Sequence, residues 1–317
     1  MKNANQLLLI TGLLCLFQQL QAFTWQVSKQ GSLVSIQLAI RQAKANDTIV
    51  VESGLYLEKN MVIDKPLVLI GKNKPVLDGE ELYEIISIRS NGVVIDGFQL
   101  VRSGYSDLTE MAAVKIYNAS RVTIRNNFFD DTRFGIYSQH SKNCIILNNR
   151  FQASGMDEMK SGNGIHCWRS DSMTITGNFI SGHRDGIYFE FVSNSSIINN
   201  QSLRNIRYGL HFMFSHNNRF DRNIFSDNGS GCAVMFSHDV VMTGNTFSKH
   251  TGSSSYGILM KEISDSFVQG NTFNHNTSGI YMEGTNRIEV LGNDFSRNGT
   301  AMRMQASCSG NMIKGNN

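Results

Sequence analysis

The stretch Gly135-Ile-Tyr-Ser-Gln-His-Ser-Lys-Asn-Cys-Ile-Ile-Leu-Asn-Asn-Arg-Phe151 decides the fold of this chain. Apolar and polar residues alternate from Gly135 and again from Ser141, and the segment Asn149-Arg-Phe closes the unit. Alternation with a period of two predicts short β-strands, because an amphipathic helix would need a period of 3.6. One unit therefore accommodates three short strands.

The same unit recurs through the rest of the chain. From Asn127 to Asn316, an asparagine returns at steps of 22, 29, 22, 23, 22, 26, 22 and 23 residues. A large apolar residue usually follows two positions later, and a small residue, mostly Gly, stands fourteen positions before. A repeat of about 20–25 residues indicates units that bury their apolar faces only against their neighbours. We therefore expect an all-β solenoid whose coils stack in parallel.

Stacking the units predicts which side chains point into the core. A column here means the equivalent positions in successive coils. One inward column is Ile136, Ile165, Ile187, Leu210, Cys232, Ile258 and Ile280. The other is Ile124, Ile146, Ile175, Ile197, Phe220, Met242, Val268 and Val290. Asparagine tolerates left-handed backbone geometry, and its amide can bond to the asparagine of the next coil. The asparagine column is therefore interpreted as a structural turn ladder. Three turn histidines, His183, His250 and His275, show no pattern.

The two ends of the chain differ from the repeats. Lys2 precedes an apolar run from Leu7 to Phe17, so residues 1–22 are interpreted as a secretory signal cleaved after Ala22, too short to span a membrane. Residues 23–317 are expected to form one domain, with a capping helix at Ser35–Ala45. The last coil has no polar cap, which indicates either truncation or a partner that covers it, and truncation is preferred.

Composition excludes one class of partner. The net charge is +3 and the basic residues are scattered, so no nucleic acid partner is expected. Four cysteines follow the leader: Cys144, Cys167, Cys232 and Cys308. They fall in different columns, and Cys167 and Cys232 lie three coils apart, about 14 Å, so they are interpreted as small buried hydrophobic residues rather than disulfide partners.

The outward positions of the strand that begins at each Gly carry the candidate site. They read Tyr137, His166, Tyr188, His211, Ala233, Leu259, Tyr281 and Gln139, Trp168, Glu190, Met213, Met235, Lys261, Glu283. Two insertions, Ala153–Asn163 and Lys249–Tyr256, fall in the same turn of different coils and should rise at one edge, about 19 Å apart. Binding residues gather where a rigid scaffold carries long loops. We therefore expect a binding groove formed by His166, Trp168, Tyr188, Glu190, His211, Met213 and Met235.

Within that groove, imidazole and thioether groups form a soft donor set that suits Cu(I). The candidate metal ligands are His211, Met213 and Met235, with His166. The same strip could instead dock another protein through its Met and aromatic side chains. A third alternative is a polysaccharide-binding, polysaccharide-cleaving or epimerising protein. It is disfavoured because the outward face holds Glu190 but no pair of carboxylates at the spacing that glycoside hydrolysis needs.

Several segments resemble the NosD family of periplasmic maturation proteins of nitrous oxide reductase. They are Gly54-Leu-Tyr-Leu-Glu, Pro75-Val-Leu-Asp-Gly, Asp185-Gly-Ile-Tyr-Phe-Glu-Phe, Arg207-Tyr-Gly-Leu-His-Phe-Met-Phe-Ser and Ala233-Val-Met-Phe-Ser. The resemblance implies a right-handed parallel β-helix of the pectate-lyase type in the periplasm, with no enzymatic activity. It also implies a role in assembling the copper centre of the reductase, in which the cargo is copper or sulfur. A membrane ABC transporter, the reductase and a copper chaperone would be the partners.

Overall fold

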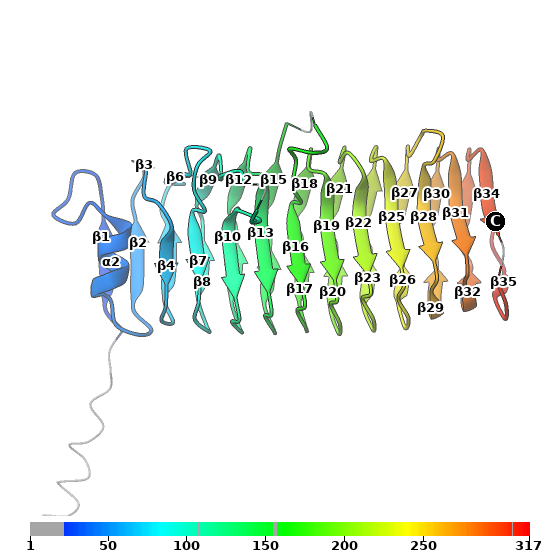
Figure 1. The fold of residues 1–317 in the computed structure, drawn as a ribbon, viewed down its shortest axis with the longest axis horizontal. Helices are drawn as coiled ribbons and strands as arrows, with labels where there is room; N and C mark the ends of the chain where they lie inside the picture. Colours follow the sequence, from blue (N-terminus) through cyan, green and yellow to red (C-terminus); the bar gives the residue numbers. More distant parts are fainter. Residues whose placement is uncertain (1–21, 107, 155–156, 306) are drawn as a thin grey trace, which may run out of the picture.

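The computed structural model describes residues 22–106, 108–154, 157–305 and 307–317, and the expected signal segment lies outside this part except for Ala22. The described chain forms one long stack of coils (Figure 1). Three parallel sheets run the length of the stack, with 13, 11 and 11 strands. The prediction of an all-β parallel solenoid with three strands per coil is confirmed. Its right-handed sense and its status as a single domain stay predictions.

Each sheet collects one strand from each successive coil. Sheet A contains β1 (Thr24–Val27), β2 (Thr48–Val51), β5 (Val68–Gly71), β8 (Val94–Asp96), β11 (Thr123–Arg125), β14 (Ile145–Leu147), β17 (Thr174–Thr176), β20 (Ser196–Ile198), β23 (Arg219–Asp221), β26 (Val241–Thr243), β29 (Ser264–Gln269), β32 (Asn286–Leu291) and β35 (Met312–Lys314). Sheet B contains β3 (Leu55–Tyr56), β6 (Val76–Asp78), β9 (Gln99–Val101), β12 (Phe128–Asp130), β15 (Arg150–Gln152), β18 (Phe179–Ser181), β21 (Gln201–Leu203), β24 (Ile224–Ser226), β27 (Thr246–Ser248), β30 (Thr272–Asn274) and β33 (Asp294–Ser296). Sheet C contains β4 (Met61–Ile63), β7 (Ile86–Ile88), β10 (Ala112–Tyr117), β13 (Phe134–Gln139), β16 (Ile165–Trp168), β19 (Asp185–Glu190), β22 (Tyr208–Met213), β25 (Ser230–Met235), β28 (Tyr256–Lys261), β31 (Ser278–Glu283) and β34 (Thr300–Met304).

The core follows the inward columns that the repeat predicts. Every member of both columns from Ile124 to Val290 is fully buried. A third column, on sheet B, stacks phenylalanine rings face to face: Phe225 on Phe247 at 5.2 Å between centroids, and Phe247 on Phe273 at 5.1 Å. The rings stack on both sides of an interruption at Ile180 and Ser202, and the buried apolar residues of the coils form one continuous core.

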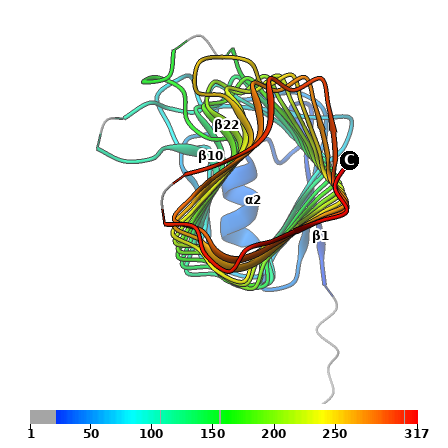
Figure 2. The same ribbon diagram turned by 90° about the vertical axis from the view of Figure 1, so that its right-hand side faces the viewer.

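A short helix closes the first coil. Helix α2 (Ile36–Gln42) begins after the N-cap Ser35, whose hydroxyl oxygen accepts from the Leu38 amide at 3.1 Å. The carboxylate of Glu58 accepts from the amides of Ile36 and Gln37, both at 2.7 Å, so a second coil helps to cap the helix. Seen along the stack, α2 lies across the end of the coils (Figure 2). The predicted capping helix is confirmed.

The asparagine column, here called the first ladder, bonds as expected. The Nδ2 atom of Asn200 donates to Oδ1 of Asn223 at 3.0 Å and to the Ile175 carbonyl at 2.9 Å. The expected left-handed backbone belongs instead to the residue before each ladder asparagine, such as Asn126 and Asn199, whose φ angles are 56° and 55°. The ladder asparagines are therefore selected for their amides and not for a strained backbone.

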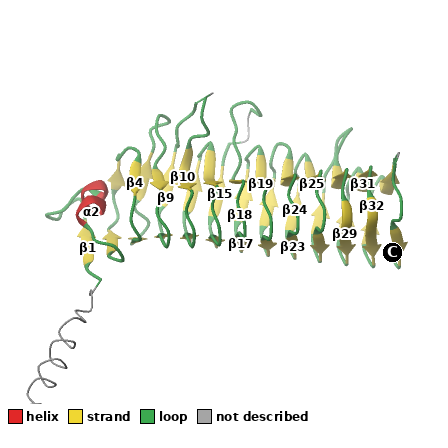
Figure 3. Cartoon of the chain, turned by 60° about the horizontal axis from the view of Figure 1, so that its bottom comes forward, coloured by secondary structure: helices red, strands yellow, loops and turns green. Residues whose placement is uncertain are grey.

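Long connections rise from one edge of the stack, where sheet B leads into sheet C (Figure 3). The two predicted insertions lie there, and a third one, residues 102–111, was missed because it falls before the regular repeats. Cys144, Cys167 and Cys232 are free and buried, as the sequence predicts. No helix in the described part of the chain is long and apolar enough to cross a membrane.

Candidate functional site

The candidate residues lie on the outer face of sheet C, in two columns. The first column is a stack of rings: Tyr137, His166, Tyr188 and His211, with centroid separations of 4.5, 4.7 and 4.7 Å. Both histidines are buried, since only 7 and 6 per cent of their surface is exposed. The sequence analysis placed both in a binding groove of outward-pointing side chains; in the structure they lie on that outer face, but their rings are covered. The wide rings of neighbouring coils pack over one another and exclude water.

His166 is held as a neutral imidazole. Its Nδ1 lies 3.3 Å from Nδ2 of Asn163, and its Nε2 has no hydrogen-bond partner among the described residues. Burial, helped by the nearby positive charges of Arg184 and Lys115, lowers the pKa of His166 to about 3. At neutral pH the ring is therefore uncharged and does not repel a cation.

His211 stands beside a buried carboxylate. Its Nδ1 lies 3.5 Å from Oδ2 of Asp185, although the two atoms are not aligned as a hydrogen bond. Asp185 is 1 per cent exposed, and its other oxygen accepts from the amide of Tyr208 at 3.2 Å. The Arg184 guanidinium approaches Asp185 at 4.0 Å. This group of charges explains how a carboxylate and an arginine are tolerated on an otherwise aromatic face.

Tyr188 separates the two candidate histidines. The strand register places His166 opposite Tyr188 and Tyr188 opposite His211, so the histidines lie two coils apart with a ring between them. They therefore cannot share one ion without displacement of Tyr188. The structure brings His211 toward Met213 on one strand, but it does not bring His166 into that group.

The second column, at the far end of these strands, holds Trp168, Glu190, Met213 and Met235, each opposite the next and each half-buried. Met213 and Met235 are direct register partners, which puts their backbones about 4.8 Å apart. Lys261 follows in the column and pairs with Glu283 at 3.1 Å. The two thioethers are thus the accessible soft donors of this face, and they lie at the strand ends away from the long loops.

Exposed aromatic rings extend this end of the face. Phe191, Phe214 and Phe236 stack at 5.2 and 5.1 Å and remain 43, 38 and 37 per cent exposed. In the turn beyond them, His216 stacks on His238 at 3.9 Å. The sequence analysis missed the three phenylalanines, although they recur five positions after Gly in three successive coils.

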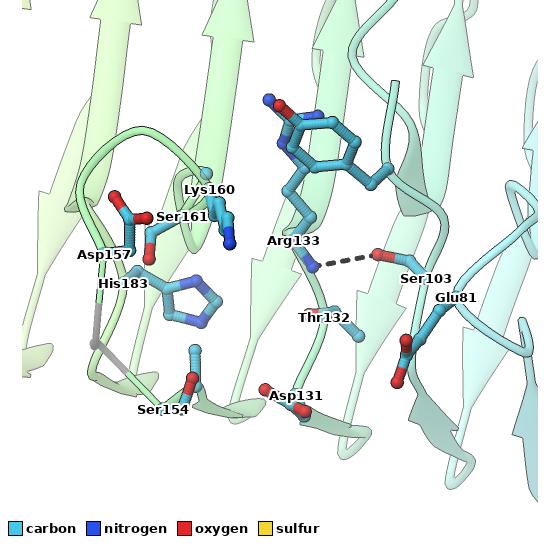
Figure 4. A pocket seen from close by; sticks show the side chains of 13 residues that line it. Glu81, Ser103, Asp131, Thr132, Arg133, Ser154, Asp157, Lys160, Ser161 and His183 are labelled. Carbon is cyan, nitrogen blue, oxygen red and sulfur yellow. Dashed lines mark hydrogen bonds between the residues drawn. The ribbon is translucent and has the colours of Figure 1, made fainter. Parts of the chain in front are cut away.

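A cavity of about 280 Å³ lies on the coils between the two predicted insertions, with Arg207, Tyr208 and Ser253 in its lining. A second cavity, of about 360 Å³, opens on the other side of the first insertion, where Ser154 and Asp157 face Ser103 and Tyr105 (Figure 4). Thr132, Arg133, Ser154, Asp157, Lys160 and His183 contribute to its lining. The first insertion also contacts the coils on its other side, because Glu158 pairs with Arg207 at 3.5 Å. Ser103 and Tyr105, which belong to a connection that the sequence analysis did not predict, thus line this second cavity.

In the described part of the chain, no group of three or more His, Cys, Asp and Glu side chains is placed to hold a metal ion. Burial raises the pKa values of the Cys144, Cys167 and Cys232 thiols, so these groups stay protonated and are poor ligands. Metal ligation by Met213 and Met235 stays a prediction.

Comparison with known sequences gives the family. A family profile described as "Periplasmic copper-binding protein (NosD)" matches residues 151–317, more than half of the chain. The chain belongs to the NosD family. One family relative is the Pseudomonas aeruginosa protein named "Probable ABC transporter binding protein NosD", which is 32% identical over 132 residues. That match covers 40% of this chain and 30% of the relative, so the matched part of this chain spans less than a third of the length of the relative.

Solved structures share the fold of this NosD family member. The A-module of the Azotobacter vinelandii mannuronan C-5 epimerase AlgE4 superposes with a TM-score of 0.62 at 15% identity, covering 85% of this chain and 91% of that one. The catalytic domain of a GH87 α-1,3-glucanase superposes with a TM-score of 0.70 at 13% sequence identity, and the match covers 93% of this chain and 69% of that one. PfbA, a Streptococcus pneumoniae surface adhesin, superposes with a TM-score of 0.61 at 14% sequence identity, and the match covers 83% of this chain and 85% of that one. At these identities the likeness concerns the fold alone.

Proposed function

We propose that this chain is a periplasmic, non-enzymatic accessory factor that binds Cu(I) as cargo during assembly of the copper centre of nitrous oxide reductase. A membrane ABC transporter would be its working partner, and the reductase and a copper chaperone would be further partners. Membership of the NosD family and the name of the Pseudomonas relative support this proposal. The observation that carries it is the thioether pair Met213 and Met235, side by side on the outer face of sheet C.

The donor set fits the cargo. Two thioether sulfurs, with the imidazole of His211 two residues before Met213 on the same face, form a soft group that favours Cu(I) over Zn²⁺, Mg²⁺ or Ca²⁺. Thioethers carry no proton near neutral pH, so copper has no proton to displace from them. We remove His166 from the predicted ligand set, because Tyr188 lies between it and His211.

The surroundings would hold the cargo loosely enough for transfer. Met213 and Met235 stay half-buried, so a partner could approach them from solvent. The exposed rings of Phe214 and Phe236 follow directly in sequence and form an apolar border that a docking protein could cover. Docking and copper binding are thus two uses of neighbouring side chains, and they are separable by substitution.

Anaerobic titration tests the copper site. We expect the protein to bind about one equivalent of Cu(I), and the double variant Met213→Ala, Met235→Ala to weaken binding at least about tenfold. Met260→Leu is the matched control, because Met260 is fully buried on the inward side of β28. Unchanged affinity in the double variant would exclude these sulfurs as ligands.

A deletion strain tests the cellular role. If the proposal holds, the reductase purified from a strain without this gene contains less copper, and the wild-type gene restores the copper content. Restoration by the double methionine variant at normal levels would mean that the thioether pair has no part in maturation. A strain with full copper content after deletion would contradict the assembly role itself.

A polysaccharide-active protein remains the second hypothesis from the sequence. On the outer face of sheet C, Asp185 is buried against His211 and Tyr208, so it is not free to act beside Glu190. This burial disfavours the paired carboxylates that hydrolysis requires. An absence of products from alginate and neutral glucans after long incubation would agree with a non-enzymatic role.

A further inference from the structure

A second ladder runs beside the first, five residues later in each coil. Asn205 donates through Nδ2 to Oδ1 of Asn228 at 2.9 Å, and Asn276 donates to Asn298 at 3.0 Å. His250 replaces asparagine between them: its Nδ1 accepts from the Asn228 amide at 3.3 Å. The sequence analysis found no pattern in His183, His250 and His275. For His183 and His250 this was wrong, because both occupy positions of the second ladder.

The second ladder breaks at His183. Its backbone amide still donates to Oδ1 of Asn205 at 3.1 Å. Its ring also faces the Arg133 backbone, but neither ring nitrogen is aligned for a hydrogen bond with a described residue. His183 is 0 per cent exposed. The equivalent positions in the two preceding coils are Ser154 and Thr132, and the Thr132 hydroxyl, 2 per cent exposed, also lacks a partner among the described residues. Unpaired buried polar groups are costly and call for an explanation.

These groups meet in the cavity of Figure 4. The His183 ring points into the hollow between Thr132, Ser154 and Lys160. Burial lowers the pKa of His183 to about 4, so its ring is neutral at pH 7 and offers one donor and one acceptor. Arg133 shapes the opposite wall: its guanidinium lies 3.8 Å from the Tyr105 ring centre, and Nη1 donates to the Ser106 carbonyl at 2.6 Å.

We propose that this cavity, at the break in the second ladder, binds one neutral sugar unit of a glycan. Its volume of about 360 Å³ lies in the range of roughly 300–1,000 Å³ that is typical of small-molecule sites, so it has room for one hexopyranose ring. The buried His183 and Thr132 face hydroxyl groups that can both donate and accept. This site goes beyond the proposed copper function and does not depend on it.

The charge of the lining selects against other small polar ligands. Three carboxylates, from Glu81, Asp131 and Asp157, stand at the rim against the two cations of Arg133 and Lys160. An excess of acceptors repels phosphate and carboxylate ligands, whereas sugar hydroxyls can donate to the same carboxylates. One face of the Tyr105 ring is covered by the Arg133 guanidinium, and the ring adds apolar surface to the lining.

Saturation-transfer NMR and titration calorimetry test the site, with D-glucose, D-mannose and N-acetyl-D-glucosamine as neutral probes and D-glucuronate and inorganic phosphate as anionic ones. We expect a millimolar Kd for at least one neutral sugar. Thr132→Val and His183→Asn should each weaken that sugar about tenfold. Neither should destabilise the fold, because each removes an unpaired group, and an asparagine in place of His183 would follow the ladder pattern.

His250→Asn is the matched control, since it makes the same exchange on the same ladder outside the cavity. Sugar affinity should not change in this variant. The proposal would be overturned if no neutral probe bound at millimolar concentrations, in about 20-fold or higher excess over the protein. Stronger binding of glucuronate or phosphate than of the neutral sugars would also overturn it. So would equal sugar affinity in Thr132→Val, His183→Asn and the wild type.

Discussion

Each buried asparagine of the first ladder serves its own coil and the next one at once. Asn200 donates through Nδ2 to the carbonyls of Ile175 and Ile198 and to Oδ1 of Asn223, and its own Oδ1 accepts from the amide of Asn178. The side chain is 1 per cent exposed, so water cannot replace these bonds. Removing the amide would leave backbone groups of two coils without partners.

We therefore expect Asn200→Ala to lower the free energy of unfolding by about 2–4 kcal/mol. The adjacent Gln201 is exposed, and Gln201→Ala should change stability by less than about 0.5 kcal/mol. Urea denaturation followed by circular dichroism measures both. Equal, small effects of the two substitutions would mean that the ladder is not a main source of stability.

At the level of the strand, the Gly column and the phenylalanine column depend on each other. A Cβ atom at Gly209 would lie 2.7 Å from Cδ1 of Phe225 and 2.8 Å from the carbonyl oxygen of Gly231. The Phe ring of sheet B reaches across the coil and fills the space beside the first residues of β22. The small residue that marks each repeat is thus required by close packing, not by a special backbone angle.

Gly209→Ala should consequently destabilise the protein by about 1–3 kcal/mol, because the contact involves backbone as well as a ring. Gly270 is the matched control: its φ is +61° and a Cβ there meets nothing within 4 Å. Gly270→Asn should be nearly neutral, since Asn occupies the equivalent left-handed positions Asn148 and Asn199. Thermal unfolding of the two variants compares them directly, and a stable Gly209→Ala variant would contradict the packing argument.

For the whole molecule, buried histidines set the response to acid. Burial lowers the pKa of His166 to about 3, and those of His183 and His250 to about 4. Unfolded histidine titrates near 6.5, so below that pH the unfolded chain binds more protons than the folded one. Stability is therefore full above about pH 6.5 and falls as the pH decreases toward the folded pKa values, by about 2 kcal/mol per histidine at pH 5.

His250→Asn should flatten this dependence. Between pH 7 and pH 5 the variant should lose about 2 kcal/mol less than the wild type, because one buried group no longer takes up a proton on unfolding. Urea midpoints at the two pH values provide the measurement. An exposed histidine offers the control: His275→Asn should leave the slope as it is. Parallel pH profiles for the wild type and His250→Asn would refute the assignment.

The sequence by itself determined the coil. Period-two alternation, the asparagine spacing and the Gly and Phe columns each depend on contacts between equivalent residues of adjacent coils, so they repeat visibly along the chain. The cap was equally local, because Ser35 and the apolar face of α2 stand together in sequence. These features predicted three strands per coil, the core columns and the buried thiols of Cys144, Cys167 and Cys232.

Only the tertiary structure decided where the site is open and where it is closed. Whether His166 and His211 face solvent depends on rings from neighbouring coils, which cover them although the alternation points both outward. The cavity depends on two loops, residues 102–111 and Ala153–Asn163, that are far apart in sequence and outside the repeat. Repetition encodes contacts between equivalent positions, but it carries no information on how irregular loops fold over a regular face.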